Sequence, residues 1–404
     1  MLNTPFSPWP SYTQEEADAV RDVILSNKVN YWTGQECRMF EKEFAAWAGC
    51  DHAVAVGNGT LALDVALKAL AIGPGDEVIV TPRTFLASVS CIVNCGAIPV
   101  FAEVDRNSQN ITADTIRDVL TSRTRAIICV HLAGWPCDMD PIMSLADEHG
   151  LWVVEDCAQA HGATYKGRAV GSIGHIGAWS FCQDKIISTI GEGGMATTND
   201  HALWSQMWSL KDHGKSWSAV YERAHPAGFR WLHESFGSNW RMMEAQAVVG
   251  RIQLRRIQQW HAQRLEAAQR IWSTAAKLAG LRVPALPPTI SHAAYKCYVF
   301  VEPAYLKPGW DRDRILQEIN ARGVPCYTGS CSEVYLEHAF DGTNWRPQQR
   351  LPIAQELGDT ALMFLVHPTL TDEELIRTCD VLMQVMHLAS STALPFEASK
   401  PAYA

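Results

Sequence analysis

Short apolar runs alternate with amphipathic segments through the first half of the chain. The runs predict strands over residues 52–56, 77–81, 98–104, 125–130, 151–156, 176–181 and 194–198. The segments around them predict helices over residues 13–26, 38–48, 60–70, 85–94, 112–120 and 140–149. Continuous apolar strands separated by helices are typical of a mainly parallel sheet with helices on both faces. The pattern predicts an α/β fold built on a seven-stranded sheet.

The pattern changes after residue 210. Residues 211–239 show little periodicity, and segments of this length are usually functional lids or interface arms. A long helix follows over residues 242–279. The last part then predicts a strand at 295–301 and helices at 311–322 and 372–387. We therefore expect two domains. The large one covers residues 1–250, with the N-terminal helices and an interface arm at 211–239. A smaller α+β domain with the long helix covers residues 251–404.

Composition narrows the classes of partner. The formal net charge is -9 and no basic cluster is present, which argues against a nucleic-acid partner. The twelve cysteines form no CxxC pair, so no metal site is predicted. The first twenty residues do not resemble a signal peptide, and no apolar run is long enough to span a bilayer. We expect a cytoplasmic protein with reduced thiols and no membrane partner.

A glycine-containing turn follows the first strand. The sequence Gly57-Asn58-Gly59-Thr60 opens a helix, where small residues let a phosphate approach backbone N–H groups at the positive helix end. Spacing like GxGxxA also suggests a dinucleotide fingerprint, which needs an acid at the end of the next strand. That strand ends at Thr81 instead. The turn therefore favours a phosphate group over a dinucleotide.

Four further groups stand at or just after other strand ends, where ligands of parallel sheets bind. Phe85 offers a flat ring, Asp156 a carboxylate, Ser180 a hydroxyl and Lys185 an amine. Lys185 follows Asp156 by 29 residues (185 − 156), which leaves room for a short hairpin around 165–171 and one strand. A phosphate turn, a carboxylate, a stacking ring and a lysine form the set that pyridoxal 5′-phosphate requires.

These motifs resemble the DegT/StrS-type aminotransferases of fold type I, most of which act on nucleotide-linked keto sugars. The matching stretches are GNGTLALDVAL, TPRTFLAS, VHLAGWPCDMDPI, VVEDCAQAHGA, SFCQDKIISTIGEGGM, GSNWRMMEAQAVVG and HPTLTDEEL. They span nearly the whole chain. The resemblance implies a PLP-transferase fold of type I and a homodimer with shared active sites.

The resemblance also assigns site residues. Lys185 would be the Schiff-base lysine, and Asp156 would partner the pyridine nitrogen of the cofactor. The remaining cofactor-binding residues would be Gly59, Thr60 and Ser180 at the phosphate, Phe85 on the ring, Gln159 near the phenolic oxygen or ring face, and Asn239 at the phosphate of the neighbouring subunit's cofactor.

The implied reaction moves an amino group from an amino acid, by family expectation L-glutamate, to a keto-deoxy sugar carried by a nucleotide. It would follow a ping-pong cycle. One alternative is an aminotransferase acting on a cyclitol or aminobenzoate-type ketone. A PLP-dependent sugar dehydratase is another, but such members replace the lysine, which is present here. A third is a binding or regulatory protein that kept the fold without catalysis.

The sequence does not decide the roles of several residues near these motifs. Arg241 is either structural or meets a substrate carboxylate or phosphate. His161 and His213 follow motif stretches, yet a lone histidine is more often a structural group. Asp184 directly precedes Lys185, and on a strand neighbouring side chains point to opposite faces. We therefore expect Asp184 to point away from the lysine.

Overall fold

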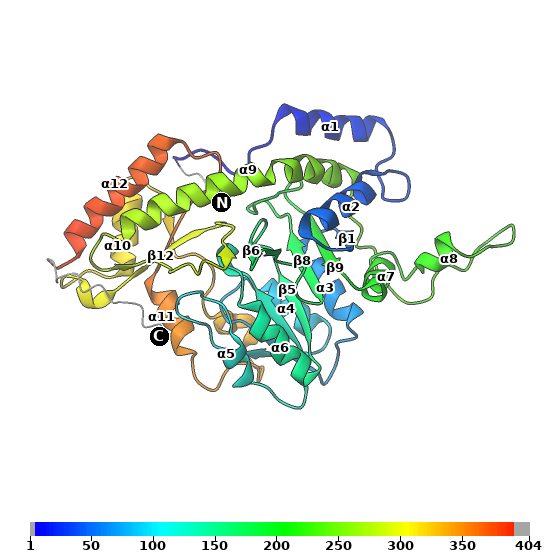
Figure 1. Ribbon diagram of the computed structural model, residues 1–404, viewed down its shortest axis with the longest axis horizontal. Coiled ribbons are helices and arrows are strands. Elements are labelled where there is room, and N and C mark those ends of the chain that lie inside the picture. The colour runs from blue at the N-terminus through cyan, green and yellow to red at the C-terminus, as the bar shows by residue number, and fades with distance from the viewer. Residues whose placement is uncertain (1–4, 392–404) are drawn as a thin grey trace.

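The computed structural model describes residues 5–391, and a seven-stranded sheet lies at its centre (Figure 1). Its order is β1-β9-β8-β5-β4-β2-β3. The strands are β1 His52–Val56, β2 Glu77–Val80, β3 Ile98–Phe101, β4 Thr124–Val130, β5 Trp152–Asp156, β8 Ile176–Ser180 and β9 Gly194–Thr198. Only β9 runs antiparallel to its neighbours, β1 and β8. The predicted seven-stranded, mainly parallel sheet is confirmed.

Helices cover both faces of this sheet. One face packs against α2 (Glu36–Ala48), α3 (Gly59–Ala69), α4 (Ala87–Asn94) and α7 (His201–Leu210). The other packs against α5 (Ala113–Arg117) and α6 (Met139–His149). The side chains of β2 show why helices must pack on both faces of the sheet. Val78 and Val80 join the first core, and Ile79 joins the second, because successive side chains point to opposite faces.

The C-terminal part contains a four-stranded antiparallel sheet of order β10-β12-β14-β13. Its strands are β10 Leu281–Arg282, β12 Cys297–Val301, β13 Cys326–Tyr327 and β14 Ala361–Phe364, and its helices are α10 Arg312–Ala321, α11 Pro352–Thr360 and α12 Asp372–Ala389. A small third sheet joins the hairpin β6 (Thr164–Tyr165) and β7 (Arg168–Ala169) to β11 (Ile290–Ser291). The predicted α+β character and the predicted hairpin are confirmed.

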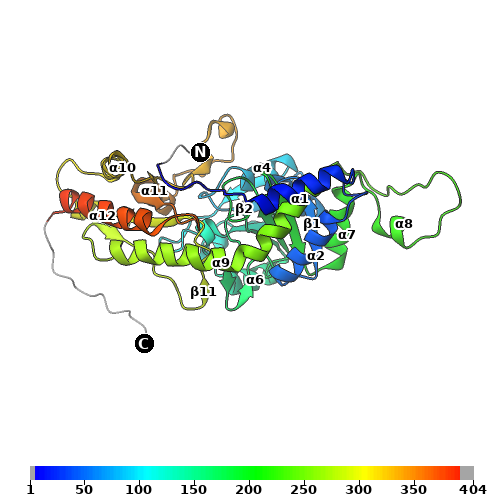
Figure 2. The same ribbon diagram turned by 90° about the horizontal axis from the view of Figure 1, so that it is seen from above.

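A long helix, α9 (Glu244–Ala275), joins the two parts. It runs along α1 (Gln14–Leu25) and α2 at one end and along α12 and β12 at the other (Figures 1 and 2). The helix is shorter at both ends than the predicted helix 242–279. It continues across residue 250, the predicted domain boundary, and therefore contributes to both predicted domains. The division into domains 1–250 and 251–404 stays a prediction, and both ranges extend beyond the described residues.

The segment 211–239 extends away from the body of the molecule and contains one short helix, α8 (Trp217–Tyr221) (Figure 1). Three aromatic side chains on it are exposed: Phe229 by 76%, Trp231 by 80% and Phe236 by 102%. Such exposure of large apolar groups on one extended segment is typical of a surface that another chain covers. Within residues 5–391, no helix has the length and apolar character to cross a membrane.

Candidate active site

The strand ends meet at one edge of the central sheet. Val130, the last residue of β4, pairs with Asp156, the last residue of β5. Asp156 in turn pairs with Ala178, two residues before the end of β8 at Ser180. This register brings the predicted carboxylate and the predicted hydroxyl to the same edge, as expected for parallel strands.

The turn before α3 is shaped for an anion. The Asn58 side chain accepts a hydrogen bond from the Leu61 N–H at 3.0 Å, while the N–H groups of Gly59 and Thr60 donate to no residue within 5–391. A Cβ atom on Gly59 would lie 2.4 Å from the Cβ of Ser180. Glycine is therefore required by this close approach. The open N–H groups at the positive end of α3 suit a phosphate.

Asp156 is held in one orientation. It is 6% exposed, and it accepts hydrogen bonds from the Ser88 hydroxyl at 2.7 Å and from the Ala158 N–H at 3.1 Å. The Ser88 hydroxyl also bonds the Thr84 hydroxyl at 2.8 Å. This chain of hydroxyls links the carboxylate to the turn that carries Phe85. Sequence reasoning missed Ser88, although it ends the quoted motif TPRTFLAS.

Two further predicted residues, Phe85 and Gln159, belong to this region. Phe85 lies in the turn linked to Asp156 by the hydroxyls, and Gln159 follows Asp156 by three residues. Phe85 is 71% exposed, so its ring is available to a ligand. Gln159 is buried, and its side-chain oxygen accepts the Ala133 N–H at 2.8 Å. The Gln159 amide N–H groups donate to no residue in the described range. They stay available to an oxygen of a bound molecule.

The Lys185 amine lies beside Asp184. Lys185 Nζ is 3.9 Å from Asp184 Oδ1 and 5.0 Å from the centre of the Tyr295 ring, and the Tyr295 hydroxyl donates to Asp184. The expectation that Asp184 points away was wrong, because Gln183 and Asp184 form a turn rather than a strand. Burial raises the pKa of Asp184, but the Lys185 charge and the Tyr295 hydrogen bond outweigh this effect and lower it.

Residues far along the chain complete the surroundings of the lysine. The Trp9 indole N–H donates to the Lys185 carbonyl at 2.8 Å, and the Tyr12 hydroxyl bonds the Ser188 hydroxyl at 2.9 Å. The sequence analysis assigned no role to Trp9, Tyr12 or Tyr295. No local pattern marks them, because their partners lie more than a hundred residues away in the chain.

Asn239 and Arg241 lie on an extended segment beside the phosphate turn. The Gly57 N–H donates to the Trp240 carbonyl at 2.9 Å, and Asn239 forms a bridge with Asp212 while remaining exposed. Arg241 Nη1 donates to Asp212 Oδ1 at 2.7 Å. Within one chain, Arg241 is therefore paired with a carboxylate. Contact of Asn239 with a neighbouring subunit stays a prediction.

The two histidines of the motif regions differ. His161 is fully buried between Trp179 and Phe181, and neither of its ring nitrogens has a hydrogen-bond partner among residues 5–391. Burial, assisted by the charge of Lys185, lowers its pKa to about 3. His161 is thus a neutral core group at pH 7. His213 is exposed at the base of the arm.

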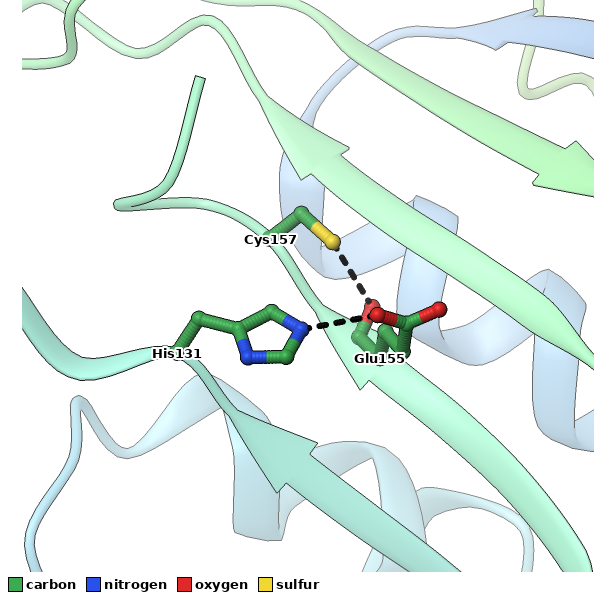
Figure 3. A group of neighbouring side chains, drawn as sticks. All are labelled: His131, Glu155 and Cys157. Carbon is green, nitrogen blue, oxygen red and sulfur yellow. Dashed lines mark hydrogen bonds and ion pairs between the residues drawn. The ribbon is translucent and has the colours of Figure 1, made fainter. Parts of the chain in front are cut away.

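A buried cluster of His131, Glu155 and Cys157 lies beneath the same edge (Figure 3). Its groups already bond one another or the backbone. His131 Nδ1 accepts the Cys137 N–H at 3.0 Å, so its Nε2 carries the proton and donates to Glu155 at 2.9 Å. The Glu155 oxygens also accept N–H groups of the 171–174 turn. This arrangement is a hydrogen-bonded support for β5, and a metal would have to displace it.

One edge of the central sheet thus carries a fixed carboxylate and an open helix N-terminus, and the loop that follows β8 carries the lysine, as expected for an aminotransferase. The chain belongs to the DegT/DnrJ/EryC1/StrS aminotransferase family, whose family model matches residues 10–383. The predicted family, fold and transaminase activity are thereby confirmed.

Three proteins illustrate the similarity. The aminotransferase from Psychrobacter cryohalolentis shares 63% identity, with a TM-score of 0.94 over 95% of this chain and 99% of that one. The dTDP-3-amino-3,4,6-trideoxy-alpha-D-glucose transaminase of Streptomyces venezuelae is 34% identical over 92% of this chain and 93% of its own length. The Streptococcus pneumoniae protein Spr1654, solved in a PLP-form, is 25% identical with a TM-score of 0.84 over 96% and 99%.

Proposed function

We propose that this aminotransferase uses pyridoxal 5′-phosphate to move an amino group from an amino acid, L-glutamate, to a ketone on a nucleotide-linked keto-deoxy sugar. The similarity to a dTDP-sugar transaminase supports the acceptor class. The PLP-form and PMP-form of a structural relative support the cofactor. Two half-reactions that share one cofactor imply a ping-pong cycle.

One observation carries the proposal: the turn at Gly59 and the Asp156 carboxylate lie at the sheet edge where β8 ends, and Ser180, the last residue of β8, precedes Lys185 by five residues (185 − 180). The open N–H groups of Gly59 and Thr60, with the Ser180 hydroxyl, would hold the phosphate. Phe85 would stack on the ring and Gln159 would bond its edge. When bound, pyridoxal phosphate supplies an aldehyde that captures amines and a ring that accepts electrons.

The protein would contribute proton transfer and charge. The Lys185 amine would take the proton from the donor's α-carbon and return it at the other end of the reacting system, as a general base and then acid. Asp156 would keep the ring nitrogen protonated, and the Ser88 hydrogen bond would keep that carboxylate in place. Asp184, 3.9 Å from the amine, would hold Lys185 close to the site when it is displaced.

The working unit would be a homodimer with shared active sites. The exposed aromatic residues of the arm, Phe229, Trp231 and Phe236, would be covered by the second subunit. Asn239, exposed at the base of the arm, would then reach the phosphate of the cofactor bound by that subunit. Only small molecules are proposed as substrates. We place the enzyme in the cytoplasm, because its twelve cysteines are all unpaired.

The acceptor distinguishes this proposal from its rivals. A cyclitol or aminobenzoate-type ketone would use the same cofactor groups, so only the acceptor pocket separates the two. A dehydratase would not need Lys185, and a non-catalytic protein would need neither Lys185 nor the fixed Asp156.

Borohydride reduction followed by peptide mapping tests the cofactor assignment. The reagent should fix a pyridoxyl group to Lys185 of the cofactor-loaded protein. A pyridoxyl group on another lysine, or on none, would contradict the proposal. Mass spectrometry of reactions with nucleotide-linked keto sugars, against a cyclitol ketone, then tests the acceptor class.

A further inference from the structure

A cavity of about 700 Å³ opens next to the lysine. It lies between the N-terminal segment, the Lys185 loop and the C-terminal part of the chain. Its lining includes Trp9, Asp184, Arg264, Tyr295, Lys296 and His367. The cavity adjoins the Lys185 amine, because two of its lining residues, Asp184 and Tyr295, contact that amine. Its volume is in the range of small-molecule sites.

Arg264, on α9, is the unusual group in this wall. It is 1% exposed, and its Nε and Nη2 atoms are enclosed without a hydrogen-bond partner. No carboxylate within residues 5–391 forms an ion pair with it. Its guanidinium carbon lies 4.9 Å from the centre of the Trp9 ring. Burial lowers the pKa of Arg264 to about 9, with the nearby Tyr295 acting in the opposite direction.

The other buried arginine, Arg83, and the half-buried Arg241 have polar partners. Arg83 bonds Gln109 at 2.9 Å and Ser332 at 2.7 Å, and Arg241 bonds Asp212 at 2.7 Å. Arg282 also has two unpartnered nitrogens, but it lies on β10 over the Phe300 ring and does not line the cavity. A buried, unpaired cation is unfavourable unless a counter-charge arrives.

We propose that Arg264 binds a carboxylate of the amino donor in this cavity. The inference rests on the proposed function and names the residue that would recognise the donor. Asp184 is the one acid among the cavity-lining residues of the described chain, and it is already engaged by Lys185 and Tyr295. A guanidinium pairs well with a planar carboxylate. Lys296, whose Nζ is 5.0 Å from the Tyr295 ring centre, offers a second cation.

A dicarboxylic donor therefore fits the charges of this wall. One carboxylate would neutralise Arg264, and Lys296 would favour the other. The aromatic rings of Trp9 and Tyr295 form part of the wall, and the attraction between opposite charges is stronger beside such apolar groups than in water. An amino acid with one carboxylate would leave one of the two cations without a partner.

Calorimetry with glutarate tests this assignment without turnover. Glutarate has two carboxylates and no amino group, so it can occupy the cavity without reacting. We compare cofactor-loaded wild type, Arg264→Gln and the matched control Arg282→Gln. Loss of a charged hydrogen-bond partner should weaken glutarate binding by about tenfold or more in Arg264→Gln. Arg282→Gln should bind glutarate like wild type.

A thermal shift measurement shows whether Arg264→Gln loses glutarate binding because it is misfolded. Removing an unpaired buried charge should leave the melting temperature of Arg264→Gln equal to that of wild type or higher. Glutarate should raise the melting temperature of wild type more than that of Arg264→Gln. If Arg264→Gln fails to fold, Arg264→Lys, which keeps the charge but loses the planar fork, should show weakened glutarate binding.

Three outcomes would overturn the inference: equal glutarate affinity in wild type and Arg264→Gln, no glutarate binding to wild type, or tighter binding of inorganic phosphate than of glutarate at Arg264. None of them touches the proposed function, which is judged by the pyridoxyl group on Lys185. If that group is absent while glutarate binding depends on Arg264, the transaminase proposal fails and the carboxylate site stands.

Discussion

The edge of the central sheet and the wall of the adjoining cavity are built in different ways. At the edge, Asp156 and Ser180 are the last residues of β5 and β8, and Gly59 begins α3 three residues after the end of β1. In the wall, Trp9, Arg264 and Tyr295 come from three distant parts of the chain and are fixed by tertiary contacts. The difference suggests a division of labour. The edge would hold the cofactor, and the wall would select what reacts with it.

The largest effect is expected from Lys185→Ala, which removes the amine proposed to transfer the proton. Transamination should be abolished while the fold is retained, because Asp184 and Tyr295, which the amine contacts, stay bonded to each other without it. Steady-state assays with L-glutamate measure the transamination activity, and circular dichroism measures whether the fold is retained. Lys166→Ala, at an exposed ion pair with Asp140, is the control. Turnover by Lys185→Ala would contradict the proposal that Lys185 takes part in the reaction.

Asp156→Asn should lower the rate of the half-reaction with glutamate about a hundredfold or more, because a neutral amide of the same shape replaces a preorganised charge. Cofactor binding should persist, since the Ala158 N–H can still donate to the amide oxygen and the Ser88 hydroxyl can rotate to accept from the amide nitrogen. Rapid-mixing spectroscopy of the half-reaction with glutamate gives the rate. A near-normal rate would mean that another group protonates the ring.

Asn239→Ala should weaken cofactor binding by about tenfold, the typical effect of losing one hydrogen bond to a charged group. Fluorescence titration with pyridoxal phosphate measures this. Mixing Asn239→Ala subunits with Lys185→Ala subunits then tests sharing. If Asn239 acts across the interface, each mixed dimer has one site with both residues intact, and active sites with wild-type cofactor affinity should appear in the mixture. If all active sites of the mixture keep the weakened affinity, Asn239 belongs to its own subunit's site.

The smallest effect concerns acid stability. The pKa of His161 is about 3, below the usual 6.5, so below pH 6.5 the unfolded chain binds a proton that the folded chain does not. The free energy of unfolding should therefore decrease from pH 6.5 toward pH 3. His161→Leu should reduce this slope without removing it, because His292 and His367 also have pKa values of about 3.

Denaturant titrations between pH 4 and pH 8 give that slope. His338→Leu, at a 99% exposed side chain whose surface ion pair with Asp341 contributes little, is the control and should change the slope far less. Loss of transamination in His161→Leu at pH 7 would show that this histidine belongs to the reacting groups rather than to the core.

The sequence predicted the edge well because its determinants are local. Strand periodicity locates Asp156 and Ser180, and the glycine turn locates Gly59 at the start of α3. The same local reasoning was wrong for Asp184, because a turn replaced the expected strand and brought its carboxylate to 3.9 Å from the lysine amine.

The cavity wall had no local signal. Arg264 is one of several arginines on α9, and its burial depends on residues distant in the chain, such as Trp9. The arm was predicted from its lack of periodicity, yet its exposed aromatic residues became evident only once the chain was folded. The domain boundary could not be set by pattern, since one continuous helix crosses it.

The most direct test of the account is the absorbance spectrum of the purified, cofactor-loaded protein before and after L-glutamate, beside Lys185→Ala. The account predicts a visible band that glutamate converts to that of the amine form of the cofactor in wild type, with no complete cycle in the variant. A protein that shows no visible band after addition of pyridoxal phosphate, or a band that no amino acid changes, would contradict the proposed transaminase chemistry.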